Sequence, residues 1–187
     1  MTNIGSEKPK ERIVGTAARL FARYGINAVG VDRICLEAEV SKRTLYKYFP
    51  SKEALVSAAI TNLGESWFEA CTNTNLTTPA ERITHVFKMV EPMAKVKDFY
   101  GCVLMNSSIE LRDSNELAVS AARDFKGRLY AFFHEQAVAM NAHKPDQLAQ
   151  QLILLYDGTS AWIVMRREFP ASTLPTLSLL LRAAQNK

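Results

Sequence analysis

The 187-residue sequence predicts an all-α protein with about nine helices. Apolar residues recur at spacings of three and four, which is typical of helices that bury one face. No stretch shows the sustained apolar–polar alternation of a half-buried strand bounded by turn residues. Capping residues, glycines and prolines stand where the apolar segments begin or end. The expected organisation is an N-terminal helix-turn-helix domain of three helices, residues 1–51, followed by a C-terminal helical body, residues 52–187.

The first four helices have clear boundary signals. They are expected at about residues 8–24, 31–38, 42–48 and 52–72. Gly25 suits the left-handed position that ends the first helix, and Gly30 serves as the N-cap of the second. Pro50 stops the third helix, because its ring disfavours helical backbone at the preceding residue and removes a hydrogen-bond donor. Ser51 is the expected N-cap of the long fourth helix.

The remaining helices are expected at about residues 79–95, 102–111, 114–140, 146–168 and 175–185. Thr78 and Glu81 form a capping box, with Pro79 at the first helical position. Pro92 is expected to bend or shorten that helix. Asp113 is the expected start signal of the long helix that ends near residue 140.

Composition narrows the class of protein. Residues 1–50 carry nine basic and five acidic side chains, so they hold the whole net charge of +4. A basic first quarter on a neutral body indicates a surface that faces an anionic polymer. The chain has neither an apolar run long enough to span a membrane nor an apolar signal-peptide core, which predicts a cytoplasmic protein with no membrane partner.

The sequence indicates no enzyme and no metal site. Cys35, Cys71 and Cys102 are widely spaced and form no CxxC or Cys/His cluster, so no disulfide framework, metal or cofactor is expected. No nucleophile–base pair and no paired carboxylates stand out, so no catalytic residue is expected. Cys102 leaves open a role as a sensor of oxidants or electrophiles, although its sequence neighbours supply no charge that would favour a thiolate.

Two short helices joined by a tight turn, the second of them basic, form a helix-turn-helix pattern. One face of the third helix, an arc of about 140°, consists of Lys42, Arg43, Tyr46 and Lys47. The opposite face consists of Leu45, Tyr48 and Phe49. Such a helix fits the major groove, where Arg binds guanine O6 and N7 in two parallel bonds and Lys reaches bases or phosphates. The alternative is a basic face that is merely solvated. Lys52 begins the next helix, where free N–H groups and the helix dipole favour a phosphate.

Three motifs between residues 17 and 56 closely resemble the DNA-binding domain of the TetR family of bacterial transcriptional regulators. They are a Leu-Phe-x-x-x-Gly end of the first helix, a Val-Ser-x-x-Thr-Leu-Tyr-x-Tyr-Phe recognition helix and a Ser-Lys-Glu-x-Leu entry to the fourth helix. The matching residues are Leu20, Phe21, Gly25, Val40, Ser41, Thr44, Leu45, Tyr46, Tyr48, Phe49, Ser51, Lys52, Glu53 and Leu55. The resemblance implies a homodimer that places its third helices in the major grooves of a palindromic operator in double-stranded DNA. It also implies a C-terminal body that dimerises and binds a small-molecule effector.

The resemblance implies a set of DNA-binding residues. The set consists of Val31, Ser41, Lys42, Arg43, Thr44, Tyr46, Lys47, Tyr48 and Lys52. Within it, Lys42, Arg43 and Tyr46 would face the bases. The phosphate-binding members would be Ser41, Thr44, Tyr48 and Lys52, while Val31 would approach the DNA backbone. Lys8 and Lys10 are expected to reach phosphates from a flexible arm.

The sequence departs from the family pattern at three places. Glu39 stands between the two helix-turn-helix helices where the family usually has Gly, and a non-Gly residue with positive φ is strained. Val29 and Gly30 stand where the family favours Thr or Ser, so a hydroxyl contact or cap is missing. Arg43 replaces a commonly small residue, and its long cation would add a guanine contact.

The C-terminal body is less informative. Residues 100–111 resemble the sixth helix of many family members, which often links the ligand pocket to the DNA-binding domain. The candidate pocket residues are Trp67, Phe68, Tyr100, Met105, Asn106, Tyr130, His134, Tyr156 and Trp162. The alternative is that these side chains fill the core. The last two helices are apolar on more than one face, and residues 158–161 are small enough for close approach across a two-fold axis.

The resulting hypothesis is a ligand-responsive transcriptional repressor that binds its operator as a dimer and is released by the effector. A ligand-independent DNA-binding regulator or an activator is the alternative. An enzyme in the helical body is a third hypothesis, which no pair of residues favours.

Overall fold

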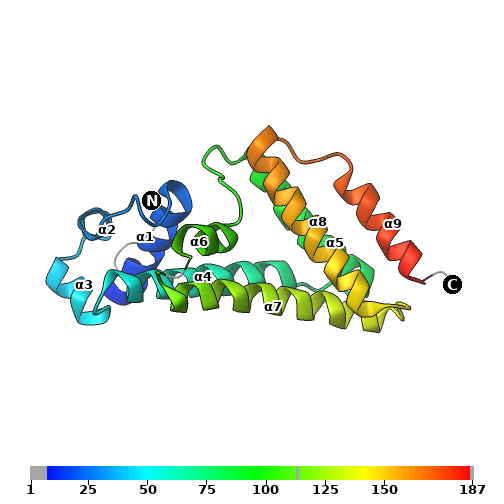
Figure 1. The fold of residues 1–187 in the computed structure, drawn as a ribbon, viewed down its shortest axis with the longest axis horizontal. Helices are drawn as coiled ribbons and strands as arrows, with labels where there is room; N and C mark the ends of the chain where they lie inside the picture. The colour runs from blue at the N-terminus through cyan, green and yellow to red at the C-terminus, as the bar shows by residue number, and fades with distance from the viewer. Residues whose placement is uncertain (1–7, 113, 186–187) are drawn as a thin grey trace. The chain divides into compact units, whose positions relative to one another are not determined.

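The computed structural model describes residues 8–112 and 114–185, and these residues form nine α-helices and one 3-10 turn. The elements are α1 (Pro9–Tyr24), α2 (Val31–Glu37), α3 (Lys42–Tyr48), α4 (Lys52–Thr72), α5 (Pro79–Val90), η1 (Glu91–Lys95), α6 (Val103–Leu111), α7 (Glu116–Ala139), α8 (Pro145–Arg166) and α9 (Thr173–Gln185) (Figure 1). The all-α prediction is therefore confirmed. In the part of the chain that the structure describes, none of the helices combines the length and apolar composition of a membrane span.

The boundary signals act largely as predicted. Thr78 Oγ1 accepts a hydrogen bond from the Glu81 N–H, and the Glu81 carboxylate accepts one from the Thr78 N–H, which completes the capping box. The hydrogen bond from the Thr78 hydroxyl is the main cause that lowers the pKa of Glu81. Near Pro92 the α-helix ends at Val90 and continues as the 3-10 turn, because proline lacks the N–H that an α-helix needs.

The chain divides into two compact units. The first contains the residues up to Glu65 together with Val103–Arg123, and the second contains Ser66–Cys102 and Asp124–Lys187. Helices α4 and α7 each begin in the first unit and end in the second. These units do not test the predicted division of roles at residue 51, which stays a prediction.

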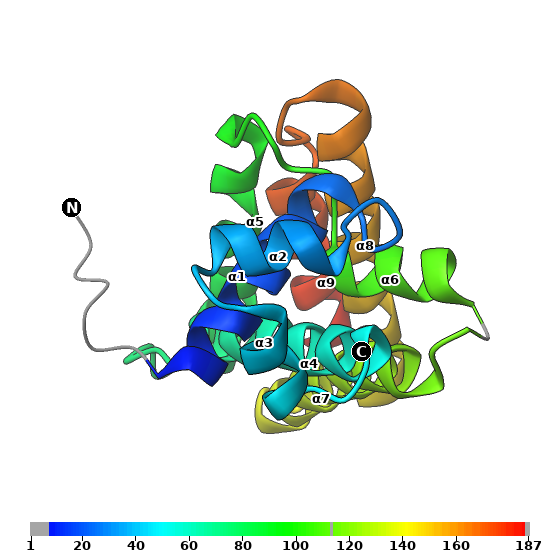
Figure 2. The same ribbon diagram turned by 90° about the vertical axis from the view of Figure 1, so that its left-hand side faces the viewer.

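In the first unit, α1, α2 and α3 pack on one another (Figure 2). Its core contains the fully buried side chains of Ile13, Leu20, Ile34, Leu45 and Leu55. The helix-turn-helix is thus held by apolar side chains from all of its helices and from the start of α4.

Asn115 fixes the start of α7 to α4. The predicted signal at Asp113 lies outside the described residues, and Asn115 precedes the helix instead. Its Oδ1 accepts from the Ala118 N–H at 3.1 Å and from the Ser57 hydroxyl at 3.2 Å, while its Nδ2 donates to the Glu53 carbonyl at 3.0 Å. The side chain is buried, and each of its polar atoms has a partner, as a buried amide requires.

In the second unit, α5, α8 and α9 pack together. Phe87 stacks on Phe133 with ring centroids 6.1 Å apart, and Tyr156 meets Phe87 edge-on at 6.4 Å. The buried Tyr156 hydroxyl accepts a hydrogen bond of 2.7 Å from Trp67 Nε1. This aromatic cluster places two of the candidate pocket residues in contact.

The three cysteines differ in accessibility, which predicts their order of reaction with iodoacetamide. Burial raises the pKa of the Cys71 thiol to about 12 and also raises the pKa of Cys35, whereas Cys102 is only half-buried. Because the thiolate is the nucleophile, we expect Cys102 to be alkylated first in the folded protein at pH 8 and Cys71 last. Peptide mass spectrometry over time measures this order, with the denatured protein as control. Faster labelling of Cys71 than of Cys102 would contradict it.

Candidate nucleic-acid interface

Helix α3 is delimited by side-chain and backbone chemistry on both ends. Ser41 is its N-cap: the Ser41 hydroxyl accepts from the Thr44 N–H at 3.0 Å and lies 2.9 Å from the Thr44 hydroxyl. Phe49 ends the helix in an extended conformation, as a residue before proline prefers. The Ser41 hydroxyl, which was predicted to hold a phosphate, therefore also caps the helix, and the Thr44 hydroxyl contacts it.

One side of α3 is buried and the other is exposed. Leu45 and Phe49 are buried against the first unit, which seats the helix. The residues predicted to read or approach DNA from this helix are exposed: Lys42, Arg43, Tyr46 and Lys47. Tyr48, which the helical wheel places with the apolar residues, is also exposed, at 36%. The segment thus presents a continuous basic and aromatic surface to solvent.

Lys42 is already paired within the molecule. Its Nζ lies 2.5 Å from Oδ1 of Asp32 on α2, and this hydrogen bond is the main cause that raises the pKa of Lys42. Arg43 and Lys47 have no ion pair or hydrogen bond to other side chains among the described residues. Arg43 is consequently the long cation of α3 that is most available to a base edge.

We expect Asp32→Asn to strengthen binding to any DNA sequence by about twofold to fivefold, because it frees Lys42 from an exposed ion pair. The slope of the logarithm of the binding constant against the logarithm of the salt concentration should also become steeper, because about one more counterion is released on binding. Fluorescence anisotropy on random duplexes between low and moderate salt measures both. Asp124→Asn, which removes an exposed carboxylate of α7, is the matched control, and an equal gain there would show only an effect of net charge.

Lys52 lies where a helix start was predicted, and it too has an internal partner. Ser51 caps α4 by accepting from the Ala54 N–H at 3.2 Å. The Lys52 ammonium donates to the Ile26 carbonyl at 3.0 Å, which ties α4 to the loop after α1. Two N–H donors of the ammonium remain for a phosphate. Val31 is half-buried at the first position of α2, where Gly30 supplies no side-chain cap.

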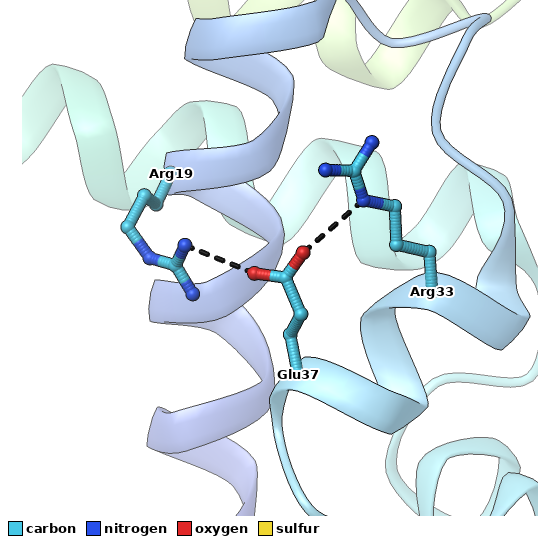
Figure 3. Close-up of polar contacts among 3 residues, drawn as sticks. All are labelled: Arg19, Arg33 and Glu37. Atoms are coloured by element: carbon cyan, nitrogen blue, oxygen red, sulfur yellow. Dashed lines mark hydrogen bonds and ion pairs between the residues drawn. The ribbon is translucent and has the colours of Figure 1, made fainter.

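An ion cluster on the surface joins α1 to α2. Figure 3 shows Glu37 reaching Arg19 of α1 and Arg33 of α2, at 3.0 and 3.1 Å. The hydrogen bond from Arg33 is the main cause that lowers the pKa of Glu37. The Arg33 guanidinium also lies 3.9 Å from the Tyr24 ring centroid. Sequence reasoning counted both arginines as positive charge available to DNA, but the structure engages them locally.

Glu110 of α6 makes a second contact that the sequence did not reveal. Its two carboxylate oxygens accept from the backbone N–H groups of Ile26 and Asn27, at 3.0 and 2.6 Å. A Cβ at Gly25 would lie 3.4 Å from both oxygens, and Gly25 has a φ of +80°. This position therefore favours Gly for its backbone conformation, and a Cβ there would touch the Glu110 carboxylate. We refer to the contact as the Glu110 latch.

Lys10 lies in the first turn of α1, because that helix begins at Pro9. The prediction that it belongs to a flexible arm is therefore wrong. Proline at the first helical position explains the early start, since its missing N–H would have no partner there. Lys8 is the residue that precedes the helix.

Comparisons with known proteins give the family. Residues 13–59 match the family described as "Bacterial regulatory proteins, tetR family". A crystal structure assigned as a TetR transcriptional regulator, sav143 of Streptomyces avermitilis, is 36% identical, covers 97% of this chain and 100% of its own, and superposes with a TM-score of 0.84. This chain belongs to the TetR family of transcriptional regulators.

Two further matches have lower sequence identity over most of the chain. The uncharacterized HTH-type transcriptional regulator YuxN of Bacillus subtilis (strain 168) is 27% identical over 157 residues, which are 82% of this chain and 53% of YuxN. The chain thus spans about half of the length of that curated relative. SCO4454, a TetR-family regulator of Streptomyces coelicolor, is 23% identical with a TM-score of 0.85, covering 95% of this chain and 96% of its own, and shows the same fold.

The turn of this TetR-family helix-turn-helix has a left-handed residue at Glu39, with a φ of +52°. This is the position at which the family resemblance led us to expect Gly. The side chain is exposed, so the carboxylate is solvated. The backbone therefore keeps a conformation that glycine adopts more easily, at a cost of about 1 kcal/mol.

The candidate effector residues belong to both compact units. Trp67 and Tyr156 contact each other in the second unit, whereas Tyr100 and Trp162 are exposed there. Phe68 lies under a guanidinium on the same unit. Met105 and Asn106 belong to the first unit, half-buried on α6.

Tyr130 and His134 of α7 both approach one carboxylate. The Tyr130 hydroxyl donates to Asp146 Oδ1 at 3.1 Å, and His134 Nε2 lies 3.5 Å from the same oxygen. The two rings stack with centroids 6.3 Å apart. The Tyr130 hydroxyl and His134 Nε2 thus both have Asp146 as a neighbour within the protein. No group of three or more metal-ligating side chains lies close together in the described parts of the chain.

Proposed function

We propose that this TetR-family chain is a sequence-specific, DNA-binding transcriptional repressor that a small-molecule effector releases from its operator. The observation that carries the proposal is the surface of α3: Arg43, Tyr46 and Lys47 are exposed while Leu45 and Phe49 anchor the helix. Anchoring fixes the direction of the exposed side chains, which is what reading base edges requires. Residues 1–51 would contact DNA and residues 52–187 would bind ligand and dimerise, in the cytoplasm.

At the DNA, the proposal gives each exposed residue one task. Arg43 binds a guanine through two parallel hydrogen bonds, and Lys42 and Tyr46 approach neighbouring base edges. Phosphate contacts come from the hydroxyls of Ser41 and Thr44 and from Tyr48 and Lys52, with Val31 against the DNA backbone. Because such phosphate contacts carry no sequence information, specificity rests on the first group.

A homodimer is supported by an apolar stripe on α8. The stripe consists of Leu154, Gly158, Ala161, Trp162 and Met165, which share an arc of about 100° and are all exposed. Leu154 is 71% exposed and Met165 is 81% exposed. A contiguous apolar helix face of this kind favours association, and a two-fold axis would align two half-sites one helical turn or a multiple apart. Thr159 and Ser160, also expected at the interface, are buried inside the protomer.

The effector half of the proposal is supported by polar groups within the second unit. Lys126 and Asp157 form a half-buried ion pair, and the Lys126 ammonium lies 4.9 Å from the Tyr156 ring centroid. Burial is the main cause that raises the pKa of Tyr156. An aromatic cluster with a few convergent polar groups is typical of small-molecule sites. The effector would shift the dimer between DNA-binding and released conformations.

The deciding experiment is an operator selection followed by substitution of Arg43. We expect Arg43→Ala to weaken binding to the selected operator by about 1–3 kcal/mol and to relax sequence preference at one base pair. Arg43→Lys is the matched control, because it keeps the charge but loses the two parallel bonds. Equal losses on operator and random DNA would refute the role of Arg43. An effector screen against the same operator separates ligand-responsive repression from a ligand-independent regulator.

A further inference from the structure

A pocket of about 420 Å³ opens within the second unit, between the end of α4, the start of α5 and the middle of α7. The residues that matter for its chemistry are Phe68, Asn73, Arg82, Arg128, Phe132 and Glu135. All of them belong to the same compact unit. The pocket is therefore defined without reference to the first unit.

Two phenylalanines form its apolar part, and an arginine covers each of them. The Phe68 and Phe132 rings meet edge-to-face, with centroids 6.4 Å apart and an interplanar angle of 85°. The Arg128 guanidinium carbon lies 4.2 Å from the Phe68 centroid, and that of Arg82 lies 5.4 Å from the Phe132 centroid. When the flat face of a guanidinium packs on a ring, the N–H groups at its edge can still donate to an oxygen atom of a ligand.

Arg82 carries a donor without an acceptor. Its Nε is buried and has no hydrogen-bond partner, and it is the sole buried side-chain nitrogen or oxygen in this condition among the described residues. Buried polar groups in native proteins are nearly always bonded, and an unmatched donor on a charged group is especially costly. An oxygen atom of a ligand at the pocket would supply the missing acceptor.

The charges of the pocket do not balance. Neither Arg82 nor Arg128 has an ion pair or a hydrogen bond within the described residues; each is engaged only by an aromatic ring. The one acidic lining residue, Glu135, is exposed and likewise forms no ion pair in that part of the chain. Two cations against one carboxylate leave a net positive charge, which a single anionic group would neutralise.

We propose that this pocket binds a small organic carboxylate whose apolar body lies on the phenylalanine rings. A carboxylate presents two oxygens in the plane that a guanidinium fork matches. The Asn73 amide is a further donor at the pocket edge. Inorganic phosphate shares the anionic chemistry but would leave the rings uncovered. This proposal goes beyond the proposed function, because a carboxylate would bind at this pocket whether or not the protein binds DNA.

The test is a titration of the full-length protein, free of DNA, with sodium benzoate. The readout is the ¹H–¹⁵N signal of the Arg82 Nε–H, which is assigned by its loss in Arg82→Lys. We expect a saturable downfield shift with benzoate, because the Nε–H gains a charged acceptor. Benzamide, which has the same ring without the charge, and sodium phosphate, which has charge without a ring, should each bind at least about tenfold more weakly.

Variants localise the site. Arg82→Lys and Arg128→Lys keep the charge and the aliphatic stem, and each should weaken benzoate binding measured by calorimetry about tenfold, since a lysine cannot form the fork. Arg166→Lys is the control, because Arg166 also lies over a ring, that of Trp162, at 5.8 Å. Equal affinity for benzamide, equal affinity for phosphate, or no response to benzoate and hexanoate would each overturn the proposal. None of these results bears on Arg43 and the operator, so the two proposals fail separately.

Discussion

Arg in place of Met165 is expected to convert the proposed dimer into a monomer. Met165 is 81% exposed at one end of the apolar stripe on α8, and a two-fold interface would bury both copies of the substituted residue. Two unpaired guanidinium groups in an apolar contact are strongly unfavourable. Light scattering coupled to gel filtration, at micromolar protein, measures the change in mass.

Loss of the dimer should also weaken the affinity for the operator, and this effect should be large. A dimer holds its second recognition helix at a high effective concentration near the second half-site, so the monomer should bind the operator about a hundredfold to ten-thousandfold more weakly. Binding to a single half-site should stay the same, because the first unit is untouched. Val138→Arg is the control: it changes another exposed apolar residue, 52% exposed on α7. A Met165→Arg protein that remains dimeric would show that the stripe is not the interface.

Ala in place of Glu110 should destabilise the first unit by about 2–4 kcal/mol. The substitution removes two charge-assisted hydrogen bonds, to the N–H groups of Ile26 and Asn27, and bonds to charged groups contribute about 1.5–3 kcal/mol each. The expected loss extends below the combined range of about 3–6 kcal/mol because the Asn27 bond is exposed to water. Urea unfolding measures the change in the free energy of unfolding.

Amide hydrogen exchange gives a local readout of the same variant. In Glu110→Ala the amides of Ile26 and Asn27 should exchange faster than those of neighbouring residues. Glu110→Gln is the matched control, because its single amide oxygen can satisfy one of the two N–H groups and should cause an intermediate loss. Unchanged exchange at both amides would mean that the Glu110 latch is not formed in solution.

The helices could be predicted from the sequence because their ends are set locally. A residue such as Thr78, Pro79 or Gly25 acts on the backbone within one turn, so a boundary can be read from a few neighbours. The two faces of α3 could be predicted for the same reason, since helical periodicity alone separates Leu45 from Arg43.

The partners of the charged residues could not be predicted, because they are distant in sequence. Glu110 and Ile26 are 84 residues apart, and Asn115 and Glu53 are 62 apart. No local pattern distinguishes Arg19, which is held by Glu37 at a separation of 18 residues, from Arg43, which has no ion pair among the described residues. The same limit applies to the effector candidates, since aromatic periodicity marks burial without showing which side chains meet.

The first unit is made of two separate stretches of the chain, and this affects how hybrids of such regulators can be built. Two residues from beyond Val103 contribute to it: Glu110 contacts the loop after α1, and Asn115 contacts the start of α4. A hybrid protein joined at one point after α3 would inherit a foreign residue at each of these two positions. We therefore expect a hybrid to keep the stability of the first unit only if both stretches of chain are exchanged together.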